Sequence, residues 1–307
     1  MRVLNLVVNE SAPFFQQQEA ILERRGIECE TIEVPGRHDT EHTRSAADYL
    51  RLHAPVLKHS RKFDIVHANY GLTAPAALLQ PTRPVVLSLW GSDLLGWTGP
   101  LSKACARRSD AVIVMSDEMA EAYGGDCEVI PHGIDMRLFE PRSMREAREE
   151  VGWTHDARHV LFPYSPDREL KDHPRAERVV DRANDAFDEP VELHAVHGVA
   201  HDAIPTYMNA ADALLMTSKR EGSPNTVKEA LACNLPVVST DVGDVCDLLS
   251  GVDPSFACET DEELVDALVE TLRRGERSNG RETVEHLRLE TMGERIEDVY
   301  RSALASR

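Results

Sequence analysis

Two glutamates separated by seven residues stand in the segment SKREGSPNTVKEALACNLPVV, residues 218–238. A carboxylate offers two oxygens side by side, so Glu229 is suited to hold the paired hydroxyls of a ribose, and Glu221 lies in the loop beside it. Gly222 between them lets the backbone approach a ligand closely. The alternative is two solvated glutamates beside an ordinary helix. Apolar runs on both sides of the segment predict strands, and this context favours a binding site.

The same segment predicts the start of a helix. Ser223 is a favourable N-cap and Pro224 a favourable first helical residue, so we expect a helix over residues 224–233. The unpaired N–H groups and the positive dipole end of such a helix attract anions. We therefore expect a diphosphate or other anion to bind beside the two glutamates.

A loop with two cations, PYSPDRELKDHP, covers residues 163–174 and follows a predicted strand. Arg168 and Lys171 in this loop can neutralise the negative charge of a leaving diphosphate. The alternative is an ordinary basic pair on a solvated loop. The whole chain has only six lysines, and the place of one of them in this loop favours a functional role.

Gly198 lies in the segment VHGVAHD, residues 196–202, after another predicted strand. A glycine there allows a close turn under a flat ring such as a nucleobase. An ordinary strand-to-helix turn explains the same residues equally well.

The first half of the chain holds polar residues at two strand ends. His67 and Asn69 lie at the end of one strand in FDIVHANYG, and Trp90 and Asp93 lie at the end of the next in LSLWGSDLLG. We take these four residues as candidates for contact with a second substrate. A single histidine at a strand end is more often structural, and His132 in IPHGID reads mainly as a hinge residue.

Parallel strands are needed to bring these segments together. Short apolar runs alternate with amphipathic stretches, which is typical of βαβ units, and continuous apolar strands suit a sheet covered on both faces. Ligands of such sheets bind at the carboxyl ends of the strands. The expected strands are residues 3–8, 29–34, 64–68, 84–89, 110–115, 128–130, 159–162, 191–196, 213–217 and 236–239.

A polar, arginine-rich stretch, residues 135–158, interrupts this alternation. We expect it to contain a linker and a short helix that join two α/β halves near residue 140. The default site for a ligand is then the cleft between the two halves.

The composition excludes several classes of protein. The 307 residues include 53 acidic and 34 basic residues, a net charge of −19, so a nucleic-acid-binding protein is not expected. The chain has no apolar run long enough to cross a membrane and no signal-peptide cleavage pattern, and its six cysteines form no CxxC pair. These features predict a cytoplasmic protein with reduced thiols.

The acid excess has two interpretations. It indicates either a surface that binds cations and repels acidic partners, or a protein adapted to a salty cytosol in which salt screens the repulsion between carboxylates. We favour the second interpretation, a halophilic protein. On this interpretation the net charge is an adaptation to the solvent and does not indicate the substrate.

Motifs for other chemistry are absent from the sequence, including GxSxG, HExxH, GxxxxGK[ST] and GxGxxG. The 13 histidines show no metal-ligand spacing. The sequence therefore does not predict the classes of enzyme that depend on these motifs.

From Glu221 the sequence reads EGSPNTVKEALACNLPVVSTDVGDVCDLL, which strongly resembles the retaining GT-B glycosyltransferases of family four. FDIVHANYGLTA, SLWGSDLLG, VIPHGID and PDRELKDHP resemble further landmarks of that family, in the same order. The resemblance implies a GT-B fold, in which two Rossmann-like domains with parallel sheets face each other across a cleft. It implies an N-terminal acceptor-side domain over residues 1–140 and a donor-binding domain over residues 141–291, with a last helix, residues 292–307, that packs on the first domain.

The resemblance also implies roles for single residues. Glu229 would hold the ribose hydroxyls and Glu221 the hydroxyls of the sugar. Arg168 and Lys171 would grip the diphosphate. The backbone of residues 222–225, which are Gly222, Ser223, Pro224 and Asn225, would complete the donor site. The implied reaction moves a sugar from a nucleotide-sugar, a substrate and not a cofactor, to a glycan, lipid-linked or small-molecule acceptor. It keeps the α-configuration and uses no metal.

The sequence departs from the family pattern at two places. Trp90 stands where the family often has a histidine near the reacting carbon, and NESAPFF replaces the glycine-rich loop after the first strand. Three rival classes share the architecture: a nucleotide-sugar epimerase, a non-catalytic nucleotide-sugar-binding protein and a nicotinamide oxidoreductase, the last of which lacks its fingerprint. The family further implies that contact with the cytoplasmic membrane face is compatible with this chain, while the oligomeric state is left open.

Overall fold

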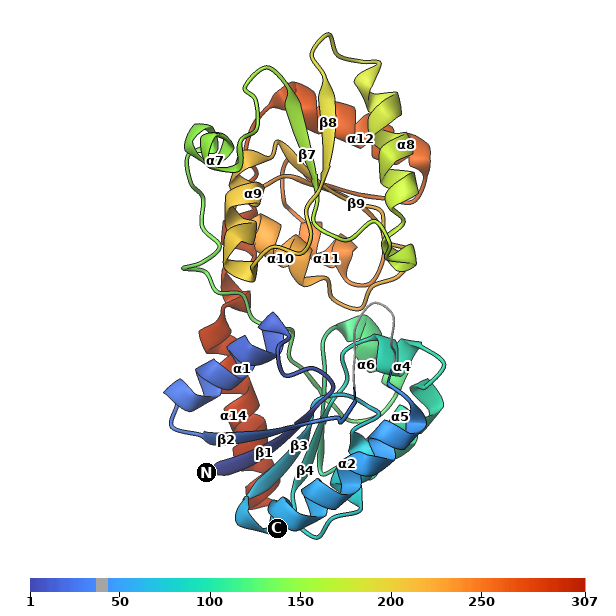
Figure 1. The fold of residues 1–307 in the computed structure, drawn as a ribbon, viewed down its shortest axis with the longest axis vertical. Coiled ribbons are helices and arrows are strands. Elements are labelled where there is room, and N and C mark those ends of the chain that lie inside the picture. Colours follow the sequence, from blue (N-terminus) through green and yellow to red (C-terminus); the bar gives the residue numbers. More distant parts are fainter. Residues whose placement is uncertain (37–43, 307) are drawn as a thin grey trace. The chain divides into compact units, whose positions relative to one another are not determined.

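The structure is a computed structural model that describes residues 1–36 and 44–306. The chain forms two compact units (Figure 1). Unit 1 consists of Met1–Gly133 and Leu289–Arg307, and unit 2 consists of Ile134–Arg288. The C-terminal segment therefore belongs to the same unit as the N-terminus.

Unit 1 contains a parallel sheet of six strands in the order β2-β1-β3-β4-β5-β6. Every residue of β3 and β4 is buried. This burial matches their continuous apolar sequences, because strands covered by helices on both faces have no solvent side. The strands are β1 (Arg2–Val7), β2 (Glu28–Glu33), β3 (Ile65–Ala68), β4 (Val85–Ser88), β5 (Ala111–Val114) and β6 (Glu128–Val129).

Helices α1 and α14 lie side by side in unit 1 (Figure 1). They come close at Gly293, where a Cβ atom would lie 2.7 Å from a side-chain carbon of Ile21. Ile296 and Tyr300 continue the buried face of α14. The helices of this unit are α1 (Pro13–Arg24), α2 (Ala46–His59), η1 (Ser60–Lys62), α3 (Ala74–Leu78), α4 (Ser92–Leu95), α5 (Gly99–Ala106), α6 (Asp117–Tyr123) and α14 (Leu289–Ala305).

Unit 2 contains a parallel sheet of five strands in the order β11-β10-β9-β7-β8. Strand β8 is therefore an edge strand, and β7 pairs with β8 on one side and β9 on the other. The strands are β7 (Arg158–Phe162), β8 (Val191–Ala195), β9 (Ala213–Met216), β10 (Val237–Thr240) and β11 (Phe256–Cys258).

Helices cover this sheet as well. The longest, α12, starts with a capping box in which Thr260 and Glu263 exchange hydrogen bonds, which fixes its first residue. The helices of unit 2 are α7 (Met144–Val151), η2 (Glu169–Lys171), α8 (His173–Asn184), η3 (His201–Ala203), α9 (Ile204–Ala210), α10 (Asn225–Ala232), α11 (Val245–Leu249), α12 (Asp261–Arg274), α13 (Gly280–Thr283) and η4 (Glu285–Leu287).

The predicted α/β fold with parallel sheets is confirmed. All ten expected strands are present, and each begins and ends within one residue of the expected position. Strand β11 was not predicted, because its three residues are too few to show a periodic pattern. Among the described residues, no helix combines the length and the apolar character needed to cross a membrane.

Candidate functional site

The strand order of unit 2 changes direction at β7, because the chain next forms β8 on one side and then β9 on the other. Ligands of open α/β sheets bind outside the carboxyl ends of the strands at such a point. Residues 163–172 follow β7, and residues 217–224 follow β9. The two segments singled out in the sequence thus leave neighbouring strands at the same edge of the sheet.

The structure brings Lys171 and Glu221 together at this edge. Nζ of Lys171 lies 2.5 Å from Oε1 of Glu221, and the two side chains are only 8% and 16% exposed. Burial lowers the pKa of Lys171, and the ion pair with Glu221 opposes this shift. The carboxylate of Glu221 therefore helps to keep the buried amine charged.

The aromatic ring of Tyr164 lies under both predicted cations. Nζ of Lys171 lies 3.9 Å from the ring centroid, and Cζ of Arg168 lies 5.9 Å from it. The side chain of Arg168 is otherwise exposed. Burial raises the pKa of Tyr164, and the charge of Glu221 raises it further, so the phenol stays neutral. Tyr164 is thus an uncharged platform that positions two cations.

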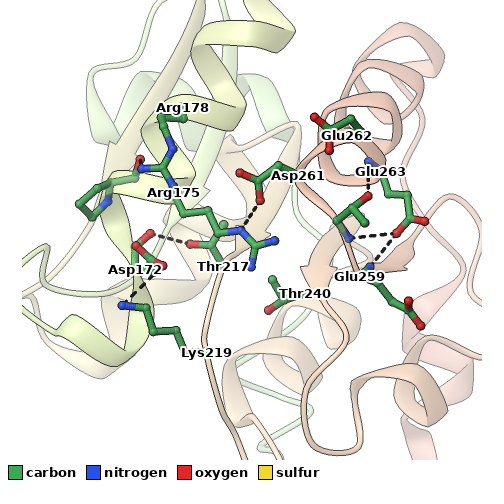
Figure 2. Close-up of polar contacts among 12 residues, drawn as sticks. Asp172, Arg175, Arg178, Thr217, Lys219, Thr240, Glu259, Asp261, Glu262 and Glu263 are labelled. Atoms are coloured by element: carbon green, nitrogen blue, oxygen red, sulfur yellow. Dashed lines mark hydrogen bonds and ion pairs between the residues drawn. The ribbon is translucent and has the colours of Figure 1, made fainter.

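Thr217 ties the two loops together (Figure 2). Its hydroxyl donates to the carbonyl oxygens of Lys171 at 2.9 Å and Asp172 at 3.0 Å. The carboxylate of Asp172 in turn lies 3.6 Å from Nζ of Lys219. Figure 2 also shows Arg175 of α8 donating to Asp261 of α12 at 2.6 Å, a contact that links the neighbouring helices. These contacts hold the backbone at Lys171 and in the residues that follow it.

Glu229 lies on α10 and pairs with a histidine that the sequence did not indicate. Nε2 of His201 lies 2.9 Å from Oε1 of Glu229, with side-chain exposures of 27% and 12%. The hydrogen bond that His201 donates to Glu229 raises the pKa of His201. Glu229 is therefore reachable from solvent and oriented by a neighbouring imidazole.

The start of α10 differs from the prediction by one residue. Pro224 is the N-cap and Asn225 the first helical residue, so Ser223 does not cap the helix. The reason is the extended backbone of Pro224, with ψ of 111°, while its carbonyl oxygen already accepts from the N–H of Val227 at 3.2 Å. The first turn of α10 nevertheless follows directly on Gly222 and Ser223.

Gly222 and Gly243 cross at close range beside this helix start. Gly243 has a φ of +60°, and a Cβ atom there would lie 2.5 Å from the carbonyl oxygen of Gly222. Gly198, after β8, has a φ of +70°, and a Cβ atom there would meet nothing within 4 Å among the described residues. The loop at Gly222 is therefore held by its neighbours, whereas Gly198 lies in an open turn.

The candidates in unit 1 fall into a buried and a half-buried group. His67 is fully buried, with Nδ1 2.6 Å from the hydroxyl of Tyr300 and Nε2 2.8 Å from that of Ser88. Asn69 is fully buried as well, and its amide contacts Gln18 and Asn5. The polar atoms of both side chains are thus used inside unit 1, which supports a structural role and not contact with a substrate.

Asp93 is also fully buried and organises a loop. Its Oδ2 accepts from the N–H of Gly71 at 2.7 Å, and its Oδ1 accepts from the N–H groups of Trp90 and Gly91 at 2.9 and 3.0 Å. Burial raises the pKa of Asp93 to about 6, and these backbone bonds oppose the shift. Asp93 therefore positions Trp90.

Trp90 is half-buried in a group of rings. Its ring centroid lies 4.8 Å from that of Phe14, 5.6 Å from that of His132 and 6.4 Å from that of Tyr70. His132 itself stacks on Phe14 at 4.5 Å. Trp90 is therefore the unit 1 candidate whose side chain reaches the surface within an aromatic cluster.

Two family models match the chain. Residues 6–138 match the model described as Glycosyltransferase Family 4, and residues 171–274 match the model described as Glycosyl transferases group 1. The structure is similar over its whole length to sucrose-phosphate synthase from Thermosynechococcus elongatus, with a TM-score of 0.77, 16% identity and full coverage of both chains. The matches and the two-sheet fold together support a GT-B glycosyltransferase.

Two relatives by sequence and one further solved structure are also similar to this chain. The chain is 29% identical over 237 residues to TuaC of Bacillus subtilis (strain 168), named as a teichuronic acid biosynthesis glycosyltransferase. It is 30% identical over 190 residues to LpsB of Rhizobium meliloti (strain 1021), a lipopolysaccharide core biosynthesis mannosyltransferase. These alignments cover 66% and 51% of this chain and 60% and 51% of the two relatives. Anabaena HepE, solved in complex with UDP-glucose, has a TM-score of 0.72 at 17% identity, covering 98% of this chain and 100% of that one.

Proposed function

We propose that this protein is a retaining glycosyltransferase that transfers a sugar from a nucleotide-sugar to a hydroxyl group of an acceptor. The observation that carries the proposal is the Lys171–Glu221 pair at the carboxyl ends of β7 and β9, inside the segment that matches the glycosyltransferase model. A buried cation beside a reachable carboxylate suits a ligand with a diphosphate and a neighbouring sugar.

In this proposal the parts of the donor contact different residues. Lys171 and Arg168 face the diphosphate together with the first turn of α10, whose N–H groups add positive potential. Glu221 accepts from hydroxyls of the sugar ring, and Glu229 accepts from the ribose hydroxyls. Gly198 lies in an open turn with room for a base.

The chemistry follows from where charge develops. The bond between the anomeric carbon and the phosphate oxygen breaks, and negative charge builds on the diphosphate next to Lys171 and Arg168. The acceptor oxygen then bonds to the same face of the carbon, and its proton passes to the departing phosphate oxygen. The α-configuration is kept, and the two side-chain cations with the helix start supply the charge stabilisation that a metal supplies in other enzymes.

The names of the relatives guide the choice of substrates. TuaC and LpsB are named for teichuronic acid and lipopolysaccharide core biosynthesis, which favours a glycan or lipid-linked acceptor. HepE was solved with UDP and with UDP-glucose, so UDP-sugars are the first donors to test. On the same basis we propose a cytoplasmic location or attachment to the cytoplasmic membrane face.

Product analysis tests the proposal. The full-length protein is incubated with UDP-, GDP-, ADP- and dTDP-sugars, with and without simple sugar and lipid-linked acceptors, and followed by NMR. The proposal predicts a new α-glycosidic bond that depends on the acceptor. A change of the donor sugar without acceptor would show an epimerase, and binding without turnover in any combination would show a non-catalytic protein.

A further inference from the structure

Three potential metal ligands lie close together on β7 and β8, the two strands at one edge of the unit 2 sheet. His159 lies on β7, and Glu192 and His194 lie on the neighbouring edge strand β8. His159 is the direct register partner of Glu192. His194 is two residues further along β8, so it lies on the same face of the sheet as Glu192. The parallel pairing of β7 and β8 therefore brings the three side chains together.

The distances among the three ligand atoms suit a metal ion. Nδ1 of His159 lies 2.9 Å from Nε2 of His194 and 3.6 Å from Oε2 of Glu192, and the last two atoms are 3.5 Å apart. A circle through these three atoms has a radius of about 1.9 Å, whereas zinc binds imidazole nitrogen at about 2.0–2.1 Å and carboxylate oxygen at about 2.0–2.2 Å. An ion slightly outside the plane of the three atoms thus reaches all of them without any movement of the strands.

The hydrogen bonds around His159 prepare it as a ligand. Its Nε2 lies 2.8 Å from the carbonyl oxygen of Thr154. Because a carbonyl only accepts, Nε2 of His159 carries the hydrogen, and its Nδ1 has a lone pair that accepts from the Nε2–H of His194 and that an ion would take up in its place. A second ring nitrogen bonded to a backbone carbonyl is the usual support of a zinc-bound histidine.

Trp153 shields the cluster without blocking it. Its ring stacks on that of His194 at 3.9 Å with an interplanar angle of 18°, and on that of His159 at 4.9 Å with an angle of 29°. A metal binds a histidine in the plane of the imidazole, so a ring on its face leaves the lone pair accessible. Glu192 is exposed, which leaves a path from solvent.

We propose that His159, Glu192 and His194 bind one Zn²⁺ ion, with water in the fourth position. His159 and Glu192 are each the second residue of their strand, so the ion lies at the amino ends of β7 and β8. The segments of the candidate sugar-nucleotide site follow the carboxyl ends of the strands. The ion therefore links the edge strand to the sheet and does not take part in transfer, and the proposal does not depend on the proposed function.

The family resemblance implies a reaction without a metal, and the 13 histidines show no metal-ligand spacing along the sequence. The proposed zinc site lies outside that expectation because it depends on the fold. His159 and His194 are 35 residues apart, and only the strand register brings them together. The short pattern Glu-x-His at residues 192–194 is too common to indicate a metal by itself.

Calorimetric titration of the chelator-treated full-length protein with zinc sulfate tests the proposal. His194→Gln and Glu192→Gln remove one ligand each at partly exposed positions, and His286→Gln removes an exposed histidine elsewhere in unit 2. Metal-free circular dichroism confirms that each variant is folded.

The expected result is one Zn²⁺ per chain for the wild type and for His286→Gln, with at least tenfold weaker binding for both cluster variants. Zinc should also raise the melting temperature of the wild type, while magnesium should not, because imidazole ligands favour zinc. Absence of binding, or cluster variants that bind within tenfold of the wild type, would overturn the proposal.

Discussion

Lys171 and Glu221 place one positive and one negative group at the point where two loops leave neighbouring strands. Each partner limits the cost of burying the other, because an unpaired buried charge is strongly unfavourable. The ion pair with Glu221 also opposes the lowering of the Lys171 pKa by burial. A preformed cation of this kind needs little reorganisation when negative charge develops on a diphosphate.

Replacement of Lys171 by alanine should lower turnover by roughly two orders of magnitude or more, the effect of losing one preorganised electrostatic group. The measurement is kcat with the donor identified by product analysis. Lys58→Ala, which removes an exposed lysine of α2, is the matched control and should keep wild-type turnover. Unchanged kcat in Lys171→Ala would contradict the role given to this residue.

The His201–Glu229 pair predicts a pH dependence of stability. The hydrogen bond to Glu229 raises the pKa of His201 above its ordinary value of 6.5. The folded state therefore binds the proton more tightly than the unfolded state, and the stabilisation is complete below pH 6.5 and is lost as the pH rises through the raised pKa.

Urea unfolding of the wild type and of His201→Gln measures this effect. The free energy of unfolding of the wild type should exceed that of the variant, and this difference should be roughly 1 kcal/mol larger at acidic pH than at alkaline pH. At acidic pH the hydrogen bond joins two charged groups, whereas at alkaline pH the imidazole is neutral. His286→Gln should show no such trend. An equal difference between wild type and His201→Gln at both pH values would argue against the charged pair.

At the scale of the elements, the crossing of two glycines positions the loop before α10. The turn after β10 passes so close to Gly222 that only a glycine fits at position 243. The N–H of Asp244 also donates to the carbonyl oxygen of Gly222 at 3.3 Å. The loop that carries Glu221 is therefore held from the side by the turn after the neighbouring strand.

Gly243→Ala should displace this loop and weaken donor binding. The matched control is Gly251→Ala, where φ is +75° and a Cβ atom meets nothing within 4 Å. Both variants carry the strain of a left-handed residue, about 1–2 kcal/mol, but only Gly243→Ala adds a clash. Thermal unfolding and donor titration should show a larger loss of stability for Gly243→Ala, and a loss of affinity confined to it. Equal losses of stability and of donor affinity in the two variants would exclude a role of Gly243 in positioning this loop.

The elements were predictable from the sequence, and the contacts between loops were not. Apolar runs and turn residues located ten of the strands, because buried parallel strands are continuously apolar. The partnership of His201 with Glu229, and of Thr217 with the backbone of Lys171, depends on how loops from different strands meet. The unit 1 candidates show the same limit, since His67 lies near the end of a strand as predicted but its side chain is fully buried.

At the scale of the whole molecule, the chain has a net charge of −19, although its candidate site contains the cations Arg168 and Lys171. Repulsion among excess carboxylates destabilises a compact chain, and salt screens it. We therefore expect the melting temperature to rise between about 0.1 M and about 2 M potassium chloride, where the screening length falls from about 10 Å to below about 3 Å. Sucrose at equal osmolarity, which does not screen charge, should raise it less. A melting temperature that falls with salt would contradict adaptation to a salty solvent.

The central claim is that unit 2 of this chain binds a nucleotide-sugar through Glu229 and its neighbours. It is tested most directly by thermal shift of the full-length protein with UDP-, GDP-, ADP- and dTDP-sugars in molar salt, on the wild type, Glu229→Ala and the exposed-site control Glu270→Ala. A specific ligand stabilises the folded protein by mass action.

We predict that sugars of one nucleotide raise the melting temperature of the wild type and of Glu270→Ala, and that Glu229→Ala needs at least tenfold more ligand for the same shift, the loss expected from about 1.4 kcal/mol of binding energy. If none of these donors stabilised the wild type, or if Glu229→Ala responded to them as the wild type does, nucleotide-sugar binding through Glu229 would be contradicted.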